Sequence, residues 1–173
     1  VEEIAATARL LADTDAAGFS IEDYDPRAGE IRPADEAAAR VRAVKAAGDD
    51  LVLTARAENH LYGVDDLDDT IARLVAYREA GADCVYAPGV IDGEDIARLV
   101  GAVDAPVNVL ALPGTPTVPE LAALGVRRVS VGSFAAWSAY GAVRSMATEL
   151  LGAGTSTYTA NLLDSDFRER AFD

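Results

Sequence analysis

The sequence predicts an α/β fold in which parallel strands alternate with helices. Short apolar strands recur at spacings of roughly 20 to 33 residues along the chain of 173, and an amphipathic helix follows each strand. Each strand ends in polar residues, and in a parallel sheet all such ends lie at one edge. About five strands are found where a closed barrel needs eight, so we expect the latter part of a (β/α)8 TIM-type barrel.

Helices are predicted where apolar residues recur at three- and four-residue spacing. The chain opens on such a helix with no strand before it, which implies that further strand–helix units precede it. Either Asp65 or Asp66 can cap the third helix. The predicted helices cover about residues 2–16, 34–47, 66–80, 96–103, 118–124, 133–151 and 159–171.

Strands are predicted where short apolar runs are bounded by turn residues. They cover residues 19–21, 51–54, 83–86, 107–110 and 128–131. Residues 23–33 are rich in Pro, Gly and Asp and are expected to form a loop. No Gly-x-Gly-x-x-Gly follows any strand, which weakens the alternative of an open dinucleotide-binding sheet.

Two domains are expected from this pattern. Residues 1–151 form a partial barrel that lacks its early strands, and residues 152–173 form a linker and a C-terminal helix. That helix either packs on its own barrel or is swapped with another subunit.

The composition excludes several classes of partner. The formal net charge of -14 argues against nucleic acid and anionic membranes. No apolar run approaches the roughly 20 residues that span a bilayer, and the first residues lack the pattern of a signal peptide. The single cysteine, Cys84, excludes an internal disulfide and favours a reducing, cytoplasmic compartment.

Two carboxylates end the first predicted strand. Glu22 and Asp23 could bind a divalent cation directly or through water, or act as general acid or base. The alternative is structural, with Asp23 capping the following turn and Glu22 paired with an arginine.

An arginine ends the second predicted strand. The planar fork of Arg56 matches the two oxygens of a substrate carboxylate, although a salt bridge to Glu22 or Glu58 would explain it equally. We expect Glu22 and Arg56 to converge in one pocket at the carboxyl ends of the strands.

Other polar residues are weaker candidates. Asn59 and Asn108 join Arg56 as predicted substrate-binding residues, and His60, the only histidine, is either a catalytic imidazole or a surface side chain. Arg128 opens the last strand at the end away from the active site and is given no catalytic role. The sequence leaves open whether the strand residues Tyr86, Asn108 and Ser130 face the barrel interior or the helices.

Four ordered segments together resemble the isocitrate lyase/phosphoenolpyruvate mutase family over about residues 2 to 150. They are Phe19-Ser-Ile-Glu-Asp23, Leu53-Thr-Ala-Arg-Ala-Glu-Asn59, residues 81–89 (GADCVYAPG) and residues 125–133 (GVRRVSVGS). The resemblance implies a (β/α)8 barrel and Mg²⁺-dependent chemistry on small 2-oxo or 2-hydroxy carboxylic acids. Members make or break C–C bonds, or cleave or rearrange P–C bonds, through an enolate-like species held by the metal.

The resemblance also implies roles for particular residues. Glu22 matches a strand-end glutamate that reaches Mg²⁺ mainly through water, and Arg56 matches the arginine that holds the substrate carboxylate. Residues 24–33 take the place of the family's mobile gating loop, and homo-oligomers, dimers or tetramers, are common in the family.

Two departures from the family pattern limit the assignment of a reaction. The principal metal-binding aspartates lie on strands that come before Glu22 and have no counterpart in this sequence. The lyases' gating-loop cysteine is also absent from residues 24–33, so a hydrolase, a mutase, a decarboxylase-like enzyme or a lyase with another acid is expected as readily. The alternatives are a barrel enzyme that binds a phosphorylated substrate at Gly132-Ser133, or a non-catalytic barrel fragment.

Overall fold

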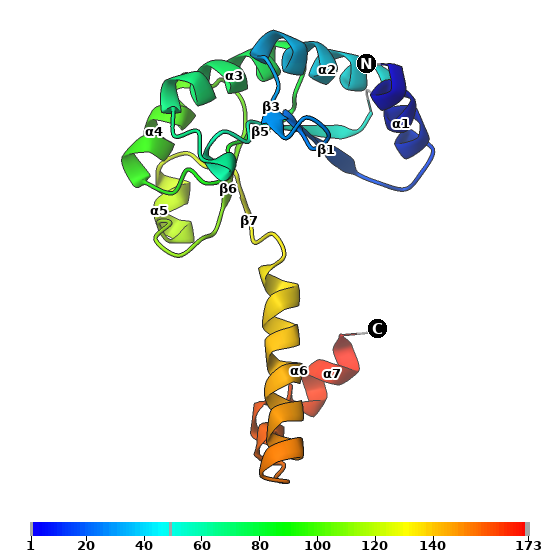
Figure 1. The fold of residues 1–173 in the computed structure, drawn as a ribbon, viewed down its shortest axis with the longest axis vertical. Coiled ribbons are helices and arrows are strands. Elements are labelled where there is room, and N and C mark those ends of the chain that lie inside the picture. Colours follow the sequence, from blue (N-terminus) through cyan, green and yellow to red (C-terminus); the bar gives the residue numbers. More distant parts are fainter. Residues whose placement is uncertain (1, 49, 172–173) are drawn as a thin grey trace. The chain divides into compact units, whose positions relative to one another are not determined.

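The computed structural model describes residues 2–48 and 50–171 (Figure 1). Residues 1, 49 and 172–173, which the two expected domains include, lie outside the described residues. Contacts divide the chain into two compact units, Val1–Ser130 and Val131–Asp173. The long helix after the last strand therefore groups with the C-terminal segment.

The first unit contains one parallel sheet in the order β1-β4-β5-β6-β7. Each strand pairs with the next strand of the sheet in chain order, as expected for successive strand–helix units. The strands are β1 (Gly18–Glu22), β4 (Val52–Arg56), β5 (Cys84–Tyr86), β6 (Val107–Leu110) and β7 (Arg128–Ser130), which confirms the five predicted strands.

Helices cover one face of this sheet. In Figure 1 they follow one another around an arc, and the strands lie on its inner side. They are α1 (Glu2–Ala12), α2 (Ala34–Ala47), α3 (Leu67–Glu79), α4 (Gly93–Ala102) and α5 (Val118–Ala123). The first helix is shorter than predicted and ends at Ala12 rather than near residue 16.

Side-chain caps explain where the helices begin. The Asp66 carboxylate accepts the N–H of Asp69 at the start of α3, as predicted, and Asp92 does the same for Glu94 and Asp95 in α4. These bonds satisfy backbone donors that have no partner inside the helix.

The hydrophobic core lies between the sheet and the helices. Leu53 and Val85 from the strands are fully buried there against Leu74 of α3 and Ile96 of α4. Full burial of such a side chain contributes about 1.5 to 3 kcal/mol, so this layer holds the strands in register. Because side chains alternate along a strand, the residues between these apolar ones face the other way.

The segment 23–33 is a short hairpin and not an irregular loop. Here β2 (Tyr24–Asp25) pairs with β3 (Glu30–Ile31) in antiparallel fashion. The Asp25 carboxylate accepts the N–H groups of Arg27 and Ala28 and pairs with Arg32 at 2.6 Å. The Pro, Gly and Asp content of this segment predicted the turn correctly. The paired strands also carry this ion pair and the stacking of Tyr24 on Tyr62, a residue distant in sequence.

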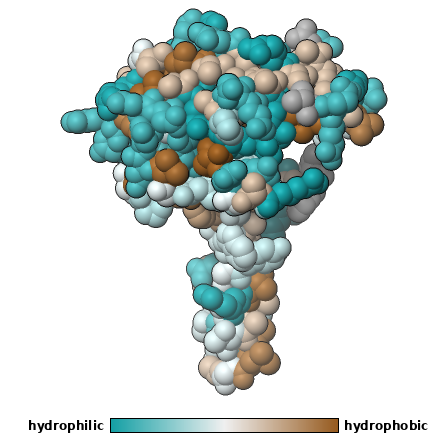
Figure 2. Space-filling view, turned by 45° about the horizontal axis from the view of Figure 1, so that its top comes forward, coloured by the Kyte–Doolittle hydropathy of each residue, from teal (hydrophilic) through white to brown (hydrophobic). Residues whose placement is uncertain are grey.

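The second unit consists of α6 (Phe134–Gly152), a 3-10 turn η2 (Thr157–Asn161) and α7 (Ser165–Arg170). The predicted terminal helix is therefore split into two short elements. Within the described chain no residue of α6 is buried, and Trp137 and Tyr140 are each 65% exposed. Figure 2 shows pale and hydrophobic residues on this unit, whereas the first unit presents mainly hydrophilic ones on the face drawn. No helix in the described ranges is long and apolar enough to cross a membrane.

Candidate functional site

One row of polar side chains crosses the whole sheet on the face away from the helices. The pairing register joins one residue of each strand to the next: Glu22 to Arg56, Arg56 to Tyr86, Tyr86 to Asn108 and Asn108 to Arg128. The intervening strand residues, such as Ala55, Val85 and Val109, belong to the apolar core. In a (β/α)8 barrel this polar face is the interior, so Tyr86 and Asn108 face inward.

Arg56 contacts three other side chains at this end of the row. Its Nη1 lies 2.7 Å from Oε1 of Glu22, while its Nε and Nη2 donate to the two carboxylate oxygens of Glu58 at 2.6 and 3.2 Å. The guanidinium carbon lies 5.1 Å from the centre of the Tyr86 ring, in cation–π range. These contacts fix the orientation of the fork at the carboxyl end of β4. Both salt bridges that the sequence left as alternatives are present, on one arginine.

The Glu22–Arg56 pair remains open to solvent. The Glu22 side chain is 44% exposed and that of Arg56 is 22% exposed. An arginine has five N–H donors, of which Arg56 uses two in hydrogen bonds to Glu58, while Nη1 forms the ion pair with Glu22. Among the described residues no other hydrogen-bonding partner of Arg56 is found, so both terminal nitrogens keep donor capacity for an added anion.

Glu58 is the buried member of the cluster, with only 1% of its surface exposed. Burial raises the pKa of its carboxyl group, and the opposing charge and hydrogen bonds of Arg56 do not cancel that effect. The sequence indicated Glu58 only as a possible partner of Arg56. Its position two residues after Arg56, just beyond the strand end, was the one available signal.

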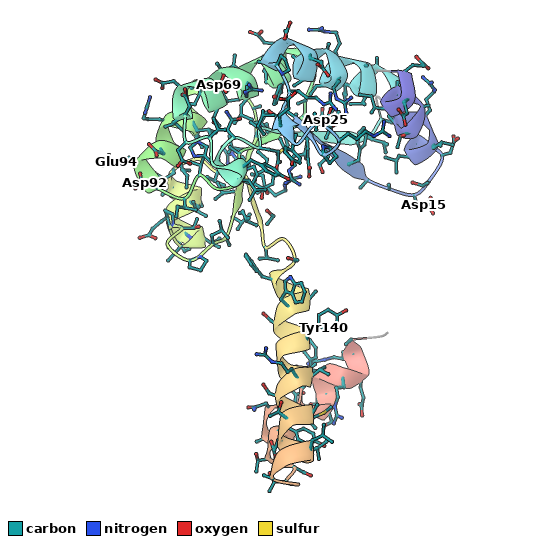
Figure 3. The ribbon with its side chains drawn as sticks, viewed as in Figure 1. Asp15, Asp25, Asp69, Asp92, Glu94 and Tyr140 are labelled. Carbon is teal, nitrogen blue, oxygen red and sulfur yellow. The ribbon has the colours of Figure 1, made fainter. Side chains whose placement is uncertain are left out.

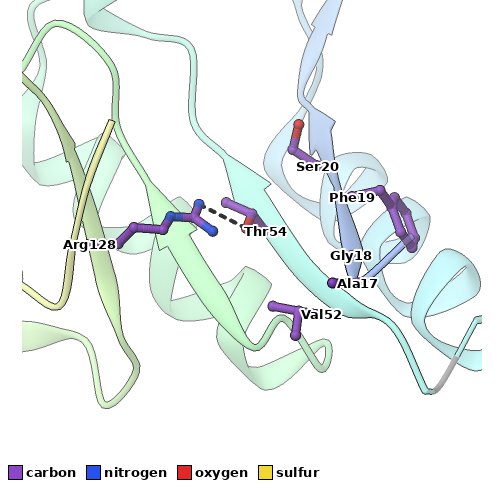
Figure 4. Close-up of a pocket in the computed structure, with 7 residues that line it drawn as sticks. All are labelled: Ala17, Gly18, Phe19, Ser20, Val52, Thr54 and Arg128. Atoms are coloured by element: carbon purple, nitrogen blue, oxygen red, sulfur yellow. Dashed lines mark hydrogen bonds between the residues drawn. The ribbon is translucent and has the colours of Figure 1, made fainter. Parts of the chain in front are cut away.

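Asn108 is held from both sides within the polar row. Its Oδ1 accepts a hydrogen bond from Nε of Arg128 at 2.9 Å, and its Nδ2 donates to Oγ of Ser130 at 3.0 Å. Arg128 extends further across the sheet and donates to Oγ1 of Thr54 (Figure 4). Arg128 thus opens β7 at the expected end of the sheet, but its side chain joins the polar row, which the sequence did not indicate.

One hollow of the first unit lies away from the Glu22–Arg56 pair. It measures about 500 Å³ and lies at the amino ends of the strands. Figure 4 shows its lining residues, Ala17, Gly18, Phe19, Ser20, Val52, Thr54 and Arg128. Reactive groups of parallel α/β enzymes gather at the opposite, carboxyl ends, so we give this hollow no catalytic meaning.

Asn59 and His60 do not join the pair. Nδ2 of Asn59 donates to the carboxylate of Asp69, which Figure 3 labels on α3, at 2.7 Å. His60 Nδ1 lies 3.5 Å from Asp65 in the following loop. In the described chain neither residue contacts Glu22 or Arg56. Ser133 lies at the start of α6, in the second unit, and its side chain forms no cap hydrogen bond.

The donor set fits only part of a magnesium site. Mg²⁺ prefers oxygen ligands and keeps several waters, and the exposed carboxylate of Glu22 suits contact through water. Glu58 is buried and bound to Arg56, so it is not a second ligand. Residues 2–48 and 50–171 contain no group of three His, Cys, Asp or Glu side chains that could hold a metal ion.

Comparison with known proteins bears on the family and on the fold. The chain matches the family described as phosphoenolpyruvate phosphomutase over residues 1–151, and it belongs to that family. This confirms the resemblance drawn from the sequence and, with it, the (β/α)8 barrel of which the chain forms a part.

Three similar proteins illustrate the range of the family. A crystal structure of a Burkholderia cenocepacia protein, provisionally classed as a lyase/mutase, superposes with a TM-score of 0.90 at 48% identity and covers 97% of this chain and 63% of its own. An uncharacterized protein of Mycobacterium tuberculosis is 38% identical over 76% of this chain and 50% of its own length. An oxaloacetate decarboxylase of Chromohalobacter salexigens is 31% identical over 91% of this chain and 59% of its own. The chain therefore spans between half and two thirds of these proteins.

Proposed function

We propose that the protein containing this chain is a Mg²⁺-dependent enzyme acting on a small 2-oxo or 2-hydroxy carboxylic acid. It makes or breaks a C–C or P–C bond through an enolate-like intermediate. The observation that carries this proposal is the Arg56 fork, held by Glu58 beside the exposed carboxylate of Glu22 at the carboxyl end of β4. Family membership and a decarboxylase of oxaloacetate among the similar proteins support the substrate class.

Arg56 is assigned the binding of the substrate carboxylate. The remaining N–H groups of its two terminal nitrogens can donate to the oxygens of a carboxylate. Glu58 and the Tyr86 ring hold that fork in place before the acid arrives, so little side-chain entropy is lost on binding. Asn108, held by Arg128 and Ser130 in the same row, is assigned a polar contact to the substrate.

Charge balance supports a cation beside Glu22. Glu22 and Glu58 together, when ionised, carry one negative charge more than Arg56 neutralises. A substrate carboxylate added to this cluster is repelled unless a further cation is present. When bound, Mg²⁺ supplies stabilisation of the negative charge that develops on an enolate oxygen, and Glu22 would hold it through water.

Two features support the further proposals of a homo-oligomer, a dimer or tetramer, and a cytoplasmic location. Trp137, Tyr140 and other apolar residues of α6 are exposed, and exposed apolar patches of this kind often form subunit contacts. Light scattering on the complete protein tests the first. The lone, buried Cys84 agrees with a reducing compartment, which cell fractionation tests.

The decisive experiment measures both binding and turnover with the complete natural protein. Turnover is assayed with Mg²⁺ and a panel of 2-oxo acids, methylisocitrate-like acids and phosphonopyruvate, and calorimetry follows the binding of oxalate, an enolate mimic, with and without Mg²⁺. We expect turnover of at least one acid and metal-dependent oxalate binding.

Matched arginine variants test the assigned role. Arg56→Lys keeps the charge but loses the fork, and it should weaken oxalate binding at least tenfold. Arg78→Lys alters an exposed pair with Asp104 and should leave binding unchanged. Absence of turnover of every acid, together with oxalate binding that ignores Mg²⁺, would refute the proposal.

A further inference from the structure

A buried carboxylate lies directly behind the Glu22–Arg56 pair. Asp23 follows Glu22 at the end of β1 and is only 2% exposed. Its Oδ1 accepts the backbone N–H of Glu58 at 2.9 Å. Its Oδ2 accepts the hydroxyl of Tyr77 at 2.6 Å and Nη1 of Arg73 at 3.3 Å, both from α3. This carboxylate thus joins the end of β1, the segment after β4 and helix α3.

The backbone of Asp23 makes two further links. Its N–H donates to the carbonyl of Arg56 at 3.3 Å, and its carbonyl accepts the N–H of Arg32 at 2.9 Å. Arg32 is the residue at which the β2–β3 hairpin returns to the barrel. Arg73 strengthens this junction, because the Nη1 that contacts Asp23 also donates to the Arg32 carbonyl at 2.7 Å.

These links fix two functional segments against each other. The carbonyl of Arg56 and the N–H of Glu58 bracket the turn that carries both halves of the buried ion pair. The hairpin that leaves at Tyr24 and returns at Arg32 has both ends tied to the same residue. A shift of Asp23 therefore moves the fork of Arg56 and the base of the hairpin together.

We propose that Asp23 is a positioning residue that holds the Arg56 fork and the base of the hairpin in a single geometry. The proposal rests on the function proposed above only where it concerns turnover. A carboxylate is needed at this position because all three groups that meet it are donors. The amide of an asparagine has one oxygen for these three donors, and its N–H₂ group can accept a hydrogen bond neither from Arg73 nor from the backbone N–H of Glu58.

Amide hydrogen exchange tests this without any substrate. In Asp23→Asn, exchange at Glu58 and Arg32 should accelerate at least tenfold relative to Val85, whose N–H donates to the carbonyl of Pro106 elsewhere in the sheet. Tyr77→Phe removes one donor, keeps the ring and should give a smaller shift of the same kind.

The matched control is a core variant on the same helix. Leu74→Ala lies between Arg73 and Tyr77, is fully buried, and has no hydrogen bond to Asp23. It should accelerate all protected amides alike, because it lowers global stability only. If Asp23→Asn and Tyr77→Phe also accelerate Glu58, Arg32 and Val85 equally, the role of Asp23 is only structural and the proposal fails.

Kinetics then separate this proposal from that of function. With an accepted acid, Asp23→Asn should lower kcat/KM at least tenfold, whereas Leu74→Ala should leave it unchanged at temperatures where the protein is folded. An unchanged kcat/KM in Asp23→Asn would overturn the positioning role even with selective exchange. If no acid is turned over, the proposed function fails, while the exchange result still decides whether Asp23 holds the two segments.

Discussion

Replacement of Arg56 by methionine tests the electrostatics of the site through stability alone. Methionine fills much of the same space but leaves the carboxylate of Glu58, almost wholly buried, without a countercharge. Removing one partner of a buried ion pair costs about 3 to 5 kcal/mol. Because the Arg56 side chain is partly exposed, we expect the lower end of that range.

The other contacts of Arg56 add little to this cost. The cation–π contact with Tyr86 contributes about 0.5 to 1 kcal/mol. The Glu22 pair, whose carboxylate is nearly half exposed, contributes about 0 to 1 kcal/mol. The expected loss in free energy of unfolding is therefore about 3 to 4 kcal/mol at pH 8, and most of it is due to the Glu58 carboxylate left without a countercharge.

A double-variant cycle isolates that carboxylate. Arg56→Met combined with Glu58→Met removes both charges, and we expect the double variant to recover about 2 kcal/mol relative to Arg56→Met. Lowering the pH to 5 should also reduce the cost of Arg56→Met, because Glu58, whose pKa burial already raises, then takes up a proton.

Urea unfolding followed by circular dichroism at pH 8 and pH 5 measures these differences. A loss below about 1 kcal/mol for Arg56→Met at pH 8 would show that the Glu58 carboxylate does not need Arg56 as its countercharge. If Arg56→Met combined with Glu58→Met is no more stable than Arg56→Met alone, the assignment of the cost to the Glu58 carboxylate is also refuted.

Three further predictions concern stability. The pKa of Glu58 is raised above its unfolded value of 4.5, so its contribution to stability is largest below that pH and is lost as the pH rises through the folded pKa. The difference in unfolding free energy between the wild type and Glu58→Gln (wild type minus variant) should therefore fall between pH 4 and pH 8. Leu53→Ala, in the fully buried centre of the sheet, should cost about 2 to 5 kcal/mol in urea unfolding, and a loss below 1 would contradict the assigned core. Asp66→Ala removes the cap on Asp69 N–H and should cost about 1 kcal/mol, whereas Asp68→Ala, which breaks only an exposed pair, should stay within about 0.5 kcal/mol.

The sequence predicted the strands well because each is a short apolar run between turn residues. All five lie within a residue or two of the expected limits, and the strand ends at Glu22 and Arg56 meet as expected. Alternation along a strand also places these polar ends on one face, since the apolar neighbours must face the helices. The family resemblance added the chemistry that spacing alone does not contain.

The sequence did not reveal which residue of another element each polar side chain contacts. Asn59 was predicted to bind substrate, and the structure adds that its amide donates to Asp69 on α3. Arg128 was given no catalytic role because it begins its strand, yet its long side chain reaches Thr54, three strands away in the sheet. The 24–31 hairpin has no alternating apolar pattern to reveal it, and the contacts beside it are an ion pair and a stacked tyrosine.

What the sequence by itself determined is local: the five strands of the parallel sheet, the approximate positions of the helices between them, and that Glu22 and Arg56 end neighbouring strands. Only the tertiary structure decided that one arginine is shared by Glu22 and Glu58, and that Asp23 is buried behind them as a junction of three segments. The physical reason is that periodicity reports the burial of one element at a time. Ion pairs and hydrogen bonds between elements depend on the strand register and helix packing that the assembled core imposes.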